Sequence, residues 1–163
     1  MFPSPEFETE VDLDAAIAVI RTPGRFAVRA TNLIQPGARI LCINGCSFDA
    51  PTRYSVQVGP KEHIDAGIET EIEESLDSYP WRCLNHSCTP NAVIRNRQLL
   101  AVCSIEPWEE VSFDYNTSEY ELATPFECEC GAEDCCGLIR GFRYLSAEER
   151  VARLPLLPSY LRA

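Results

Sequence analysis

Residues 85–88 read Asn-His-Ser-Cys, residues 113–116 read Phe-Asp-Tyr-Asn, and residues 128–137 read Cys-Glu-Cys-Gly-Ala-Glu-Asp-Cys-Cys-Gly. These three stretches, in this order, decide how the rest of the chain is interpreted. Each is weak evidence alone, because Asn and Ser favour turns and short aromatic motifs are common. Together they combine a polar turn, an aromatic segment and a cysteine cluster, and that ordered set is a strong signal.

Length and composition predict one soluble globular domain. The chain has 163 residues, which suits a single hydrophobic core, and 45% of them are hydrophobic. No run approaches the roughly 18 apolar residues that a membrane span requires. The first residues lack the basic and apolar regions of a secretory signal. We therefore expect an intracellular protein with no membrane partner.

The net charge of −11 indicates which kinds of binding partner the protein favours. Phosphate binding needs concentrated Lys and Arg, and the sequence has no such run, so we expect no direct binding to nucleic acid. The acidity suits a basic protein or peptide, although many soluble proteins are simply acidic. One acidic cluster is either a solvated loop or short helix, or a rim that attracts a basic peptide. Its members are Glu69, Glu71, Glu73, Glu74 and Asp77.

Short alternating segments between turn signals predict a mainly β domain. Residues 11–21 are predicted to form a helical turn or linker, and Asn44-Gly45 a tight reversal. A helix is predicted from Ala147 to about Leu154, because Ser146 and Glu149 form a capping-box pattern. The predicted strands are 25–30, 39–43, 54–58, 91–95, 98–103 and 110–115, with a hairpin about residues 96–97.

The nine cysteines could form disulfide bonds or bind a metal ion. The count is odd and four of them fall between Cys128 and Cys136, a spacing that favours metal in an intracellular protein. Cys128, Cys130 and Cys135 supply three thiolates, and a structural zinc takes four ligands, so the fourth must come from elsewhere. Unligated thiols or one disulfide remain the alternative. Cys42, Cys46, Cys83 and Cys103, in apolar strand contexts, are predicted to be core residues.

The three motifs resemble SET-domain lysine methyltransferases that carry a post-SET zinc motif, over roughly residues 23–145. The resemblance is to a small stand-alone member without a pre-SET region. It implies several small β-sheets, a knot-like C-terminal threading, a zinc-bound post-SET loop and a short C-terminal helix. We expect a lead-in segment over 1–21, the SET domain over 22–120, and the post-SET loop and tail over 121–163.

The same resemblance assigns the two ligand sites. It makes Cys88 the fourth zinc ligand, and it makes Tyr115 the catalytic residue. Thr22 stands where the family has the first glycine of a Gly-x-Gly turn, which leaves the details of cofactor binding open. The residues expected to hold S-adenosylmethionine are Gly24, Arg25, Phe26, Asn85, His86 and Leu138.

The expected substrate channel is aromatic. Tyr54 and Phe142 are candidate walls by aromatic character and position, and core packing is the alternative for both. Phe113 stands two residues before Tyr115, and in this family a Phe there implies di- or trimethylation.

The implied reaction is a direct displacement on a sulfonium methyl group. The lysine must first lose its proton, and desolvation in an apolar channel favours that loss. A phenol oxygen facing the methyl carbon suits the role of Tyr115. The resemblance therefore implies methylation of a protein lysine, in a histone or another basic protein, in the nucleus of a eukaryote or otherwise in the cytoplasm. A small-molecule substrate or a non-catalytic binding module are the alternatives.

Overall fold

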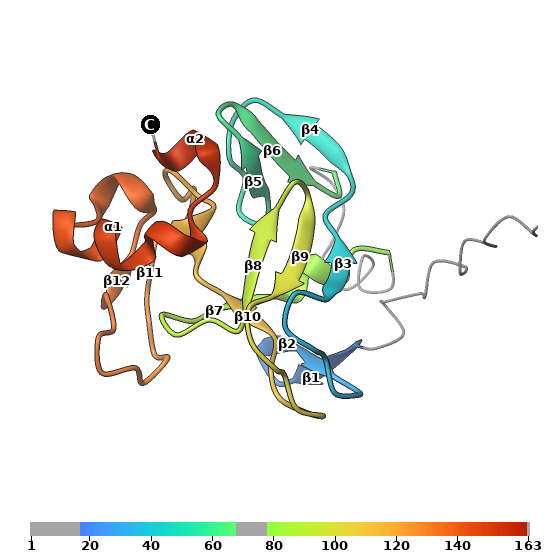
Figure 1. The fold of residues 1–163 in the computed structure, drawn as a ribbon. Helices are drawn as coiled ribbons and strands as arrows, with labels where there is room; N and C mark the ends of the chain where they lie inside the picture. Colours follow the sequence, from blue (N-terminus) through green and yellow to red (C-terminus); the bar gives the residue numbers. More distant parts are fainter. Residues whose placement is uncertain (1–16, 68–77, 163) are drawn as a thin grey trace, which may run out of the picture.

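The computed structural model describes residues 17–67 and 78–162 of the chain. The acidic cluster over residues 69–77 lies outside the described residues. The described part is mainly β and forms five small sheets around one main core (Figure 1). Within it, no helix is long and apolar enough to cross a membrane.

Two of the sheets have three strands and three have two. β1 (Ile17–Thr22) pairs with β2 (Arg25–Ala30). The first three-stranded sheet has the order β3 (Arg39–Cys42), β9 (Gln98–Ala101), β8 (Ala92–Arg95). The second has the order β4 (Cys46–Phe48), β6 (Glu62–Asp65), β5 (Val56–Gly59). The remaining pairs are β7 (Asn85–His86) with β10 (Ser112–Phe113), and β11 (Phe126–Glu127) with β12 (Leu138–Ile139).

Helical elements are short and lie mostly toward the C-terminus. Helices α1 and α2 and the β11–β12 hairpin lie on one side of the molecule in Figure 1, beyond β7 and β10. The elements are η3 (Pro80–Cys83), η4 (Tyr115–Thr117), η5 (Phe142–Tyr144), α1 (Ala147–Arg153), η6 (Leu154–Leu156) and α2 (Ser159–Arg162).

Several predictions from local patterns are confirmed. β2 has the predicted bounds, and β8 and β9 form the predicted hairpin. Asn96 and Arg97 have φ angles of 47° and 61°, the left-handed pair that a two-residue hairpin turn of the primed type requires. The capping box at Ser146 and Glu149 is complete and starts α1 at the predicted residue.

Other predictions are wrong because tertiary pairing overrides local propensity. Residues 17–22 form a strand rather than a helical turn, since their β-branched residues pair along the whole of β2. Residues 62–65, which are not among the predicted strands, form β6 between β4 and β5. The predicted strand over 110–115 is reduced to Ser112–Phe113, and the next residues turn into η4.

The chain does not reverse at Asn44-Gly45 as predicted. It passes from one three-stranded sheet to the other, and the N–H of Ile43 donates to the carbonyl of Arg97 at 2.7 Å. Gly45 has φ +153° and lies against the backbone of Asp65, where a Cβ atom would overlap the carbonyl. Glycine is therefore needed here for close backbone approach.

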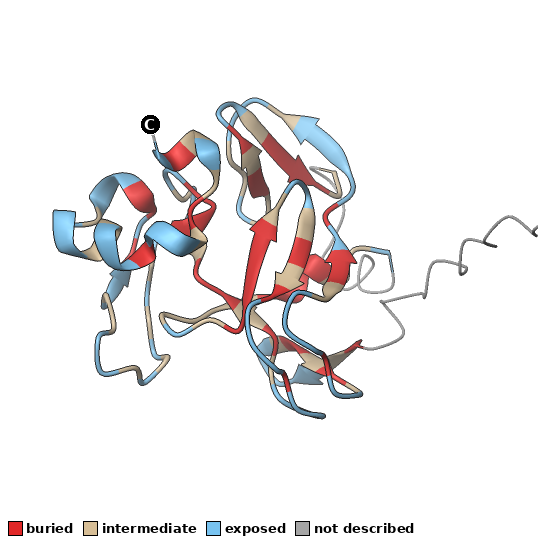
Figure 2. Ribbon diagram, viewed as in Figure 1, coloured by how far each residue is buried: buried red, intermediate tan, exposed pale blue. Residues whose placement is uncertain are grey.

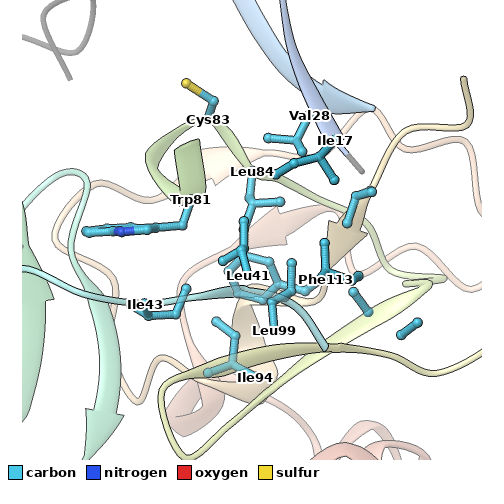
Figure 3. Close-up of a cluster of buried hydrophobic side chains, with 14 of the residues drawn as sticks. Ile17, Val28, Leu41, Ile43, Trp81, Cys83, Leu84, Ile94, Leu99 and Phe113 are labelled. Carbon is cyan, nitrogen blue, oxygen red and sulfur yellow. The ribbon is translucent and has the colours of Figure 1, made fainter. Parts of the chain in front are cut away.

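The main core fills the space between the sheets. Trp81, Ile40, Leu41, Leu99 and Phe113 are buried in it. Figure 3 shows the side chains of Trp81, Leu41, Leu99 and Phe113 gathered in one cluster. Figure 2 shows the buried residues on the inner strands, while α1 is mostly exposed. A second, small cluster holds Phe142, Leu157 and Leu161.

The prediction that the isolated cysteines are core residues holds for Cys83 alone. Cys42, Cys46 and Cys103 are exposed. Cys42 is the last residue of β3, Cys46 is the first residue of β4, and Cys103 follows the end of β9, so all three lie at strand ends rather than in strand interiors.

Candidate active site and metal centre

A parallel strand pair brings the first two motifs together. β7 and β10 align Ser112 with Asn85 and Phe113 with His86. The N–H of Ser87 continues the ladder to the carbonyl of Phe113 at 3.1 Å. The polar turn and the aromatic motif, distant in sequence, therefore form one surface.

His86 is held in one tautomer. Its Nδ1 accepts the backbone N–H of Tyr115 at 3.0 Å, and its Nε2 lies 3.2 Å from Sγ of Cys88. Burial lowers the pKa of His86, which outweighs the opposing effect of Asp114, so the ring is neutral. Because Nδ1 must accept, the single proton lies on Nε2 and points at the sulfur. The ring thus joins the aromatic motif to the cysteine site.

Asn85 ties three segments together. Its Nδ2 donates to the carbonyl of Phe26 and to Oε1 of Glu110, both at 2.7 Å. Glu110 in turn contacts the guanidinium of Arg25 at 3.4 Å. β2, β7 and the segment before β10 are therefore fixed relative to one another at the site.

A large cavity of about 500 Å³ opens against this surface. We call it the large cavity; its volume is in the range of small-molecule and cofactor sites. It is lined by most of the residues predicted to hold the cofactor and by the chain around the cysteine loop. The lining residues include Arg25, Phe26, Asn85, His86, Tyr115, Phe126, Glu127, Cys128 and Cys130.

Two predicted cofactor residues are not in the lining of this cavity. Leu138 is 50% exposed in β12, where it pairs with Glu127. Gly24 lies in the β1–β2 turn with φ +73°. Thr22 pairs with Arg25 across that turn, and its hydroxyl donates to the carbonyl of Arg25 at 3.3 Å. Thr22 therefore closes the turn as the last residue of β1.

A small cavity of about 60 Å³ shares a wall with the large one. We call it the small cavity. Tyr54 and Tyr115 line both, and Phe113 lines the small cavity. Its full lining is Thr52, Arg53, Tyr54, Ser55, Val56, Trp81, Arg82, Leu84, Phe113, Tyr115, Glu119, Leu122 and Ala123.

Phe142 lines neither of the two cavities. It packs instead with Leu157 and Leu161, with the guanidinium of Arg150 4.7 Å from its ring centroid. The packing alternative therefore describes Phe142. The reason is that the tail after β12 turns into η5 and covers its own aromatic residue with the C-terminal helices.

Tyr115 stands at the junction of the two cavities. Its hydroxyl donates to the carbonyl of Leu84. Burial raises the pKa of Tyr115, and the charges of Glu119 and Glu110 raise it further, so the phenol keeps its proton. The ring packs at 4.8 Å from Phe113 and 5.7 Å from Phe126, measured between centroids. The phenol is therefore rigid, and only its oxygen lone pairs are available to a ligand.

The four predicted metal ligands converge. The sulfurs of Cys88, Cys128, Cys130 and Cys135 all lie within 4.8 Å of one another, and Cys88 and Cys135 are 3.9 Å apart. Tetrahedral zinc with Zn–S bonds of ~2.3 Å requires sulfur–sulfur edges of about 3.8 Å. The geometry suits a structural zinc ion, and all nine cysteines are free thiols.

Cys136 lies outside that group, as expected for a neighbour of a ligand. Its sulfur accepts from Nη2 of Arg153 at 2.9 Å, and Nε of Arg153 donates to Asp114 at 2.6 Å. Asp114 and Arg153 are both buried. This ion pair ties α1 to the aromatic motif. Sequence reasoning missed it, although Asp114 within the motif and a basic residue in the last turn of α1 were visible.

The SET domain family matches residues 25–116 of the chain. Methyltransferase flvH of Aspergillus flavus is 31% identical over 138 residues, which are 77% of this chain and 67% of that protein. A histone-lysine N-methyltransferase of Gibberella zeae, H3 lysine-36 specific, is 28% identical over 160 residues, 86% of this chain but 17% of that protein.

A similar fold occurs in a solved structure of KRYPTONITE in complex with DNA, an H3(1–15) peptide and SAH. The TM-score is 0.55, with 24% identity over 75% of this chain and 29% of that one.

Proposed function

This chain belongs to the SET-domain family, and from that premise we propose that it transfers methyl groups from S-adenosylmethionine to a lysine side chain of a protein. The observation that carries the proposal is the position of Tyr115. A rigid phenol stands where a cofactor-sized cavity meets an aromatic cavity that has room for the end of a side chain. A methyltransferase needs that arrangement, because donor and acceptor must meet in line from two sides.

The large cavity is the proposed cofactor site. Arg25, Phe26, Asn85 and His86 line it, and the neighbouring KRYPTONITE structure contains SAH. When bound, the cofactor supplies a methyl group on a positively charged sulfur. Asn85 contributes by fixing β2 and β7 through its two hydrogen bonds, so the cavity is shaped before any ligand arrives. Gly24 and Leu138 stay in the proposal as residues that close over the cofactor.

The small cavity is the proposed lysine channel. Tyr54, Trp81 and Phe113 supply aromatic walls that exclude water and favour the neutral amine. The oxygen of Tyr115 offers lone pairs toward the methyl group, because its proton is held by Leu84. Phe113 leaves space beside the amine, which supports di- or trimethylation.

The cysteine group is the proposed zinc site. A zinc ion held by Cys88 and the 128–135 loop would fix that loop against the polar turn. The loop supplies Cys128 and Cys130 to the wall of the large cavity, next to Glu127 of β11, so metal binding would order the cofactor site.

A histone or another basic protein is the proposed substrate. The net charge of −11 favours basic partners, and the Gibberella zeae relative is H3 lysine-36 specific. A histone substrate implies a nuclear protein. The expectation that the chain does not bind nucleic acid stays a prediction, since the KRYPTONITE complex contains DNA.

A small-molecule amine is the second candidate substrate. The observation that favours it is coverage: the chain spans 67% of Methyltransferase flvH, a name that specifies no protein substrate, but 17% of the histone enzyme.

Radiolabelled S-adenosylmethionine tests the proposal directly. The protein is incubated with core histones, with other basic proteins and with small-molecule extracts, and Tyr115→Phe serves as the inactive control. Label on histone lysines supports the first candidate, and label in the extract alone supports the second. Cofactor binding by calorimetry without transfer to either would overturn the enzymatic proposal and leave a binding module.

A further inference from the structure

A buried carboxyl group faces the small cavity from the side of Tyr115. Glu119 is 3% exposed and lines that cavity. Its backbone is fixed at both ends, because its N–H donates to the carbonyl of Tyr115 and its carbonyl accepts the N–H of Phe142, both at 2.8 Å. Glu119 belongs to none of the three sequence motifs, and sequence reasoning missed it.

The carboxylate of Glu119 is held by the backbone N–H of Gln57 and by the side chain of Ser118. Oε1 accepts the backbone N–H of Gln57 at 2.7 Å. The Gln57 side chain is itself locked, since it donates to Gly59 at 2.9 Å and accepts from Tyr120 at 2.8 Å. Oε2 lies 4.0 Å from Nδ1 of His63, too far for a hydrogen bond, and that nitrogen has no partner in the described part of the chain.

The charges around this group set its behaviour. Glu119 is the one carboxylate among the described residues that line the small cavity, where Arg53 and Arg82 are the cations. Arg82 lies 3.3 Å from Asp65, and Tyr115 and Tyr160 stand nearby as neutral phenols whose pKa values burial raises. Burial also raises the pKa of Glu119 to about 8, against the opposing hydrogen bonds from the Gln57 N–H and the Ser118 side chain. Burial lowers the pKa of His63, which keeps it neutral.

The reaction requires a proton acceptor at this place. An amine that enters as an ammonium ion has no lone pair with which to attack a methyl group. Tyr115 cannot take the proton, because its phenol is already protonated and donates to Leu84. Arg53 and Arg82 are cations and cannot take it either.

We propose that Glu119 takes the proton from the substrate ammonium in the small cavity, an inference that rests on the proposed function and adds a catalytic base to it. An N–H bond of the ammonium breaks, its electron pair stays on nitrogen, and the proton forms an O–H bond on Glu119. The neutral amine then forms the N–C bond while the C–S bond breaks and its pair goes to sulfur. Glu119 can take the proton only while its carboxyl is ionised, so the step requires a pH near or above its raised pKa of about 8.

The first arm of the test needs no methyl transfer. Difference infrared spectroscopy of the full chain follows the carboxylic-acid C=O band between pH 6 and 10, in wild type, Glu119→Gln and Glu121→Gln. Glu121 is the matched control because it is two residues away, exposed, and bonded to Arg143 and Tyr144 outside both cavities. We expect one band that titrates near pH 8 in wild type and the control and is missing in Glu119→Gln. Addition of n-butylammonium, which resembles the end of a lysine, should change it.

The second arm measures single-turnover methyl transfer against pH at saturating cofactor. We expect wild type and Glu121→Gln to share a rising limb with an apparent pKa near 8. Glu119→Gln should lose that limb and fall roughly a hundredfold in rate, and Glu119→Asp should restore part of it. Cofactor affinity by calorimetry should stay within threefold in all variants.

The two arms separate the inference from the function on which it rests. Glu119→Gln with an unchanged pH limb and a rate within threefold of wild type would overturn the role of Glu119 alone. Absence of the titrating band, or no response to n-butylammonium, would overturn it even if the enzyme is active. A wild type that binds n-butylammonium through Glu119 but methylates no amine would contradict the proposed function and leave amine binding at Glu119 standing.

Discussion

The hydroxyl of Tyr115 has one proton, and the structure commits that proton to the carbonyl of Leu84. The consequence is directional: whatever enters the large cavity meets the oxygen lone pairs rather than a donor. The side chain of Tyr115 therefore connects the carbonyl of Leu84, the residue that follows η3, with the two cavities. Residue-level changes at this junction should alter chemistry more than stability.

Tyr115→Phe removes the oxygen and keeps the ring packed against Phe113 and Phe126. We expect methyl transfer to fall by a factor on the order of 100 or more, because a positioned polar group is lost from the reaction axis. Cofactor affinity by calorimetry should change by less than about fivefold. Transfer rates of the variant close to those of wild type would show that the phenol has no role in the reaction.

Phe113→Tyr adds a hydroxyl to the wall of a cavity of about 60 Å³. Since Phe113 is 3% exposed and its ring lies 4.8 Å from that of Tyr115, the extra oxygen has little room outside the cavity. We expect product to shift toward monomethyl lysine. Mass spectrometry of the product after long incubation measures the shift, and an unchanged ratio of mono-, di- and trimethyl forms would reject it.

At the scale of elements, the C-terminal segment depends on one glycine. Gly141 precedes η5 with φ +114°, and a Cβ atom there would lie 2.6 Å from the carbonyl oxygen of Tyr120. The close approach lets the tail return beside η4, where the N–H of Phe142 bonds to Glu119. Gly37 also has a positive φ, +81°, but no atom lies within 4 Å of the position that its Cβ would occupy. It therefore shares the unusual backbone conformation of Gly141 without the close backbone approach.

Gly141→Ala should therefore destabilise the protein by roughly 3 kcal/mol or more, because strain and a backbone clash add. Gly37→Ala, the matched control, should cost about 1 kcal/mol from its positive φ alone. Urea unfolding gives both values. Equal losses of unfolding free energy in the two variants would mean that the backbone near Tyr120 can move to accommodate the new methyl group with no loss of stability.

Local sequence patterns correctly predicted the elements that are stabilised mainly by local interactions. The β8–β9 hairpin followed from Asn96-Arg97, and α1 followed from its capping box. They did not predict β6, because Glu62–Asp65 has mixed polarity and becomes a strand only between β4 and β5. The prediction that Phe142 is a channel wall was wrong for a related reason. Its aromatic character indicates that the side chain is buried, but does not indicate which element it packs against.

At the scale of the whole molecule, the cysteine site was predictable and the polar interior was not. The 128–135 spacing indicated three of the four sulfurs, the family resemblance supplied Cys88, and the four lie together in the structure. Nothing in the sequence separates Glu119 from the exposed acids beside it, since its burial comes from the packing of β5, η4 and η5. The Asp114–Arg153 pair arises in the same way, from the docking of α1.

Metal removal should affect the C-terminal part first. We expect one zinc per chain by mass spectrometry of the metal, its loss in Cys135→Ser, and its retention in Cys103→Ser, whose thiol is exposed and outside the group. Chelation should lower the Tm and weaken cofactor binding, because the 128–130 loop lines the large cavity. A chelated protein with an unchanged Tm and cofactor affinity would contradict a structural metal.

Glu119 should also make folding stability depend on pH. Its pKa rises from 4.5 to about 8 on folding, so the folded state binds the proton more tightly than the unfolded state. Stability is therefore lost as pH rises through this window. Glu119→Gln should remove that loss and gain on the order of 2 kcal/mol relative to wild type between pH 6 and 8.5. Urea unfolding at both pH values measures it; parallel pH dependences in the two proteins would be the contrary result.

The ion pair between Asp114 and Arg153 bears on how the chain can be cut or fused. Arg153 is the last residue of α1, yet its partner carboxylate lies beside Tyr115, and its guanidinium also reaches the sulfur of Cys136. A protein truncated where the family match ends, at residue 116, or anywhere before residue 153, would lack Arg153. The buried carboxylate of Asp114 beside Tyr115 would then have lost its cationic partner. The closing helices are thus structural members of the catalytic domain, and a purification tag is best placed beyond them.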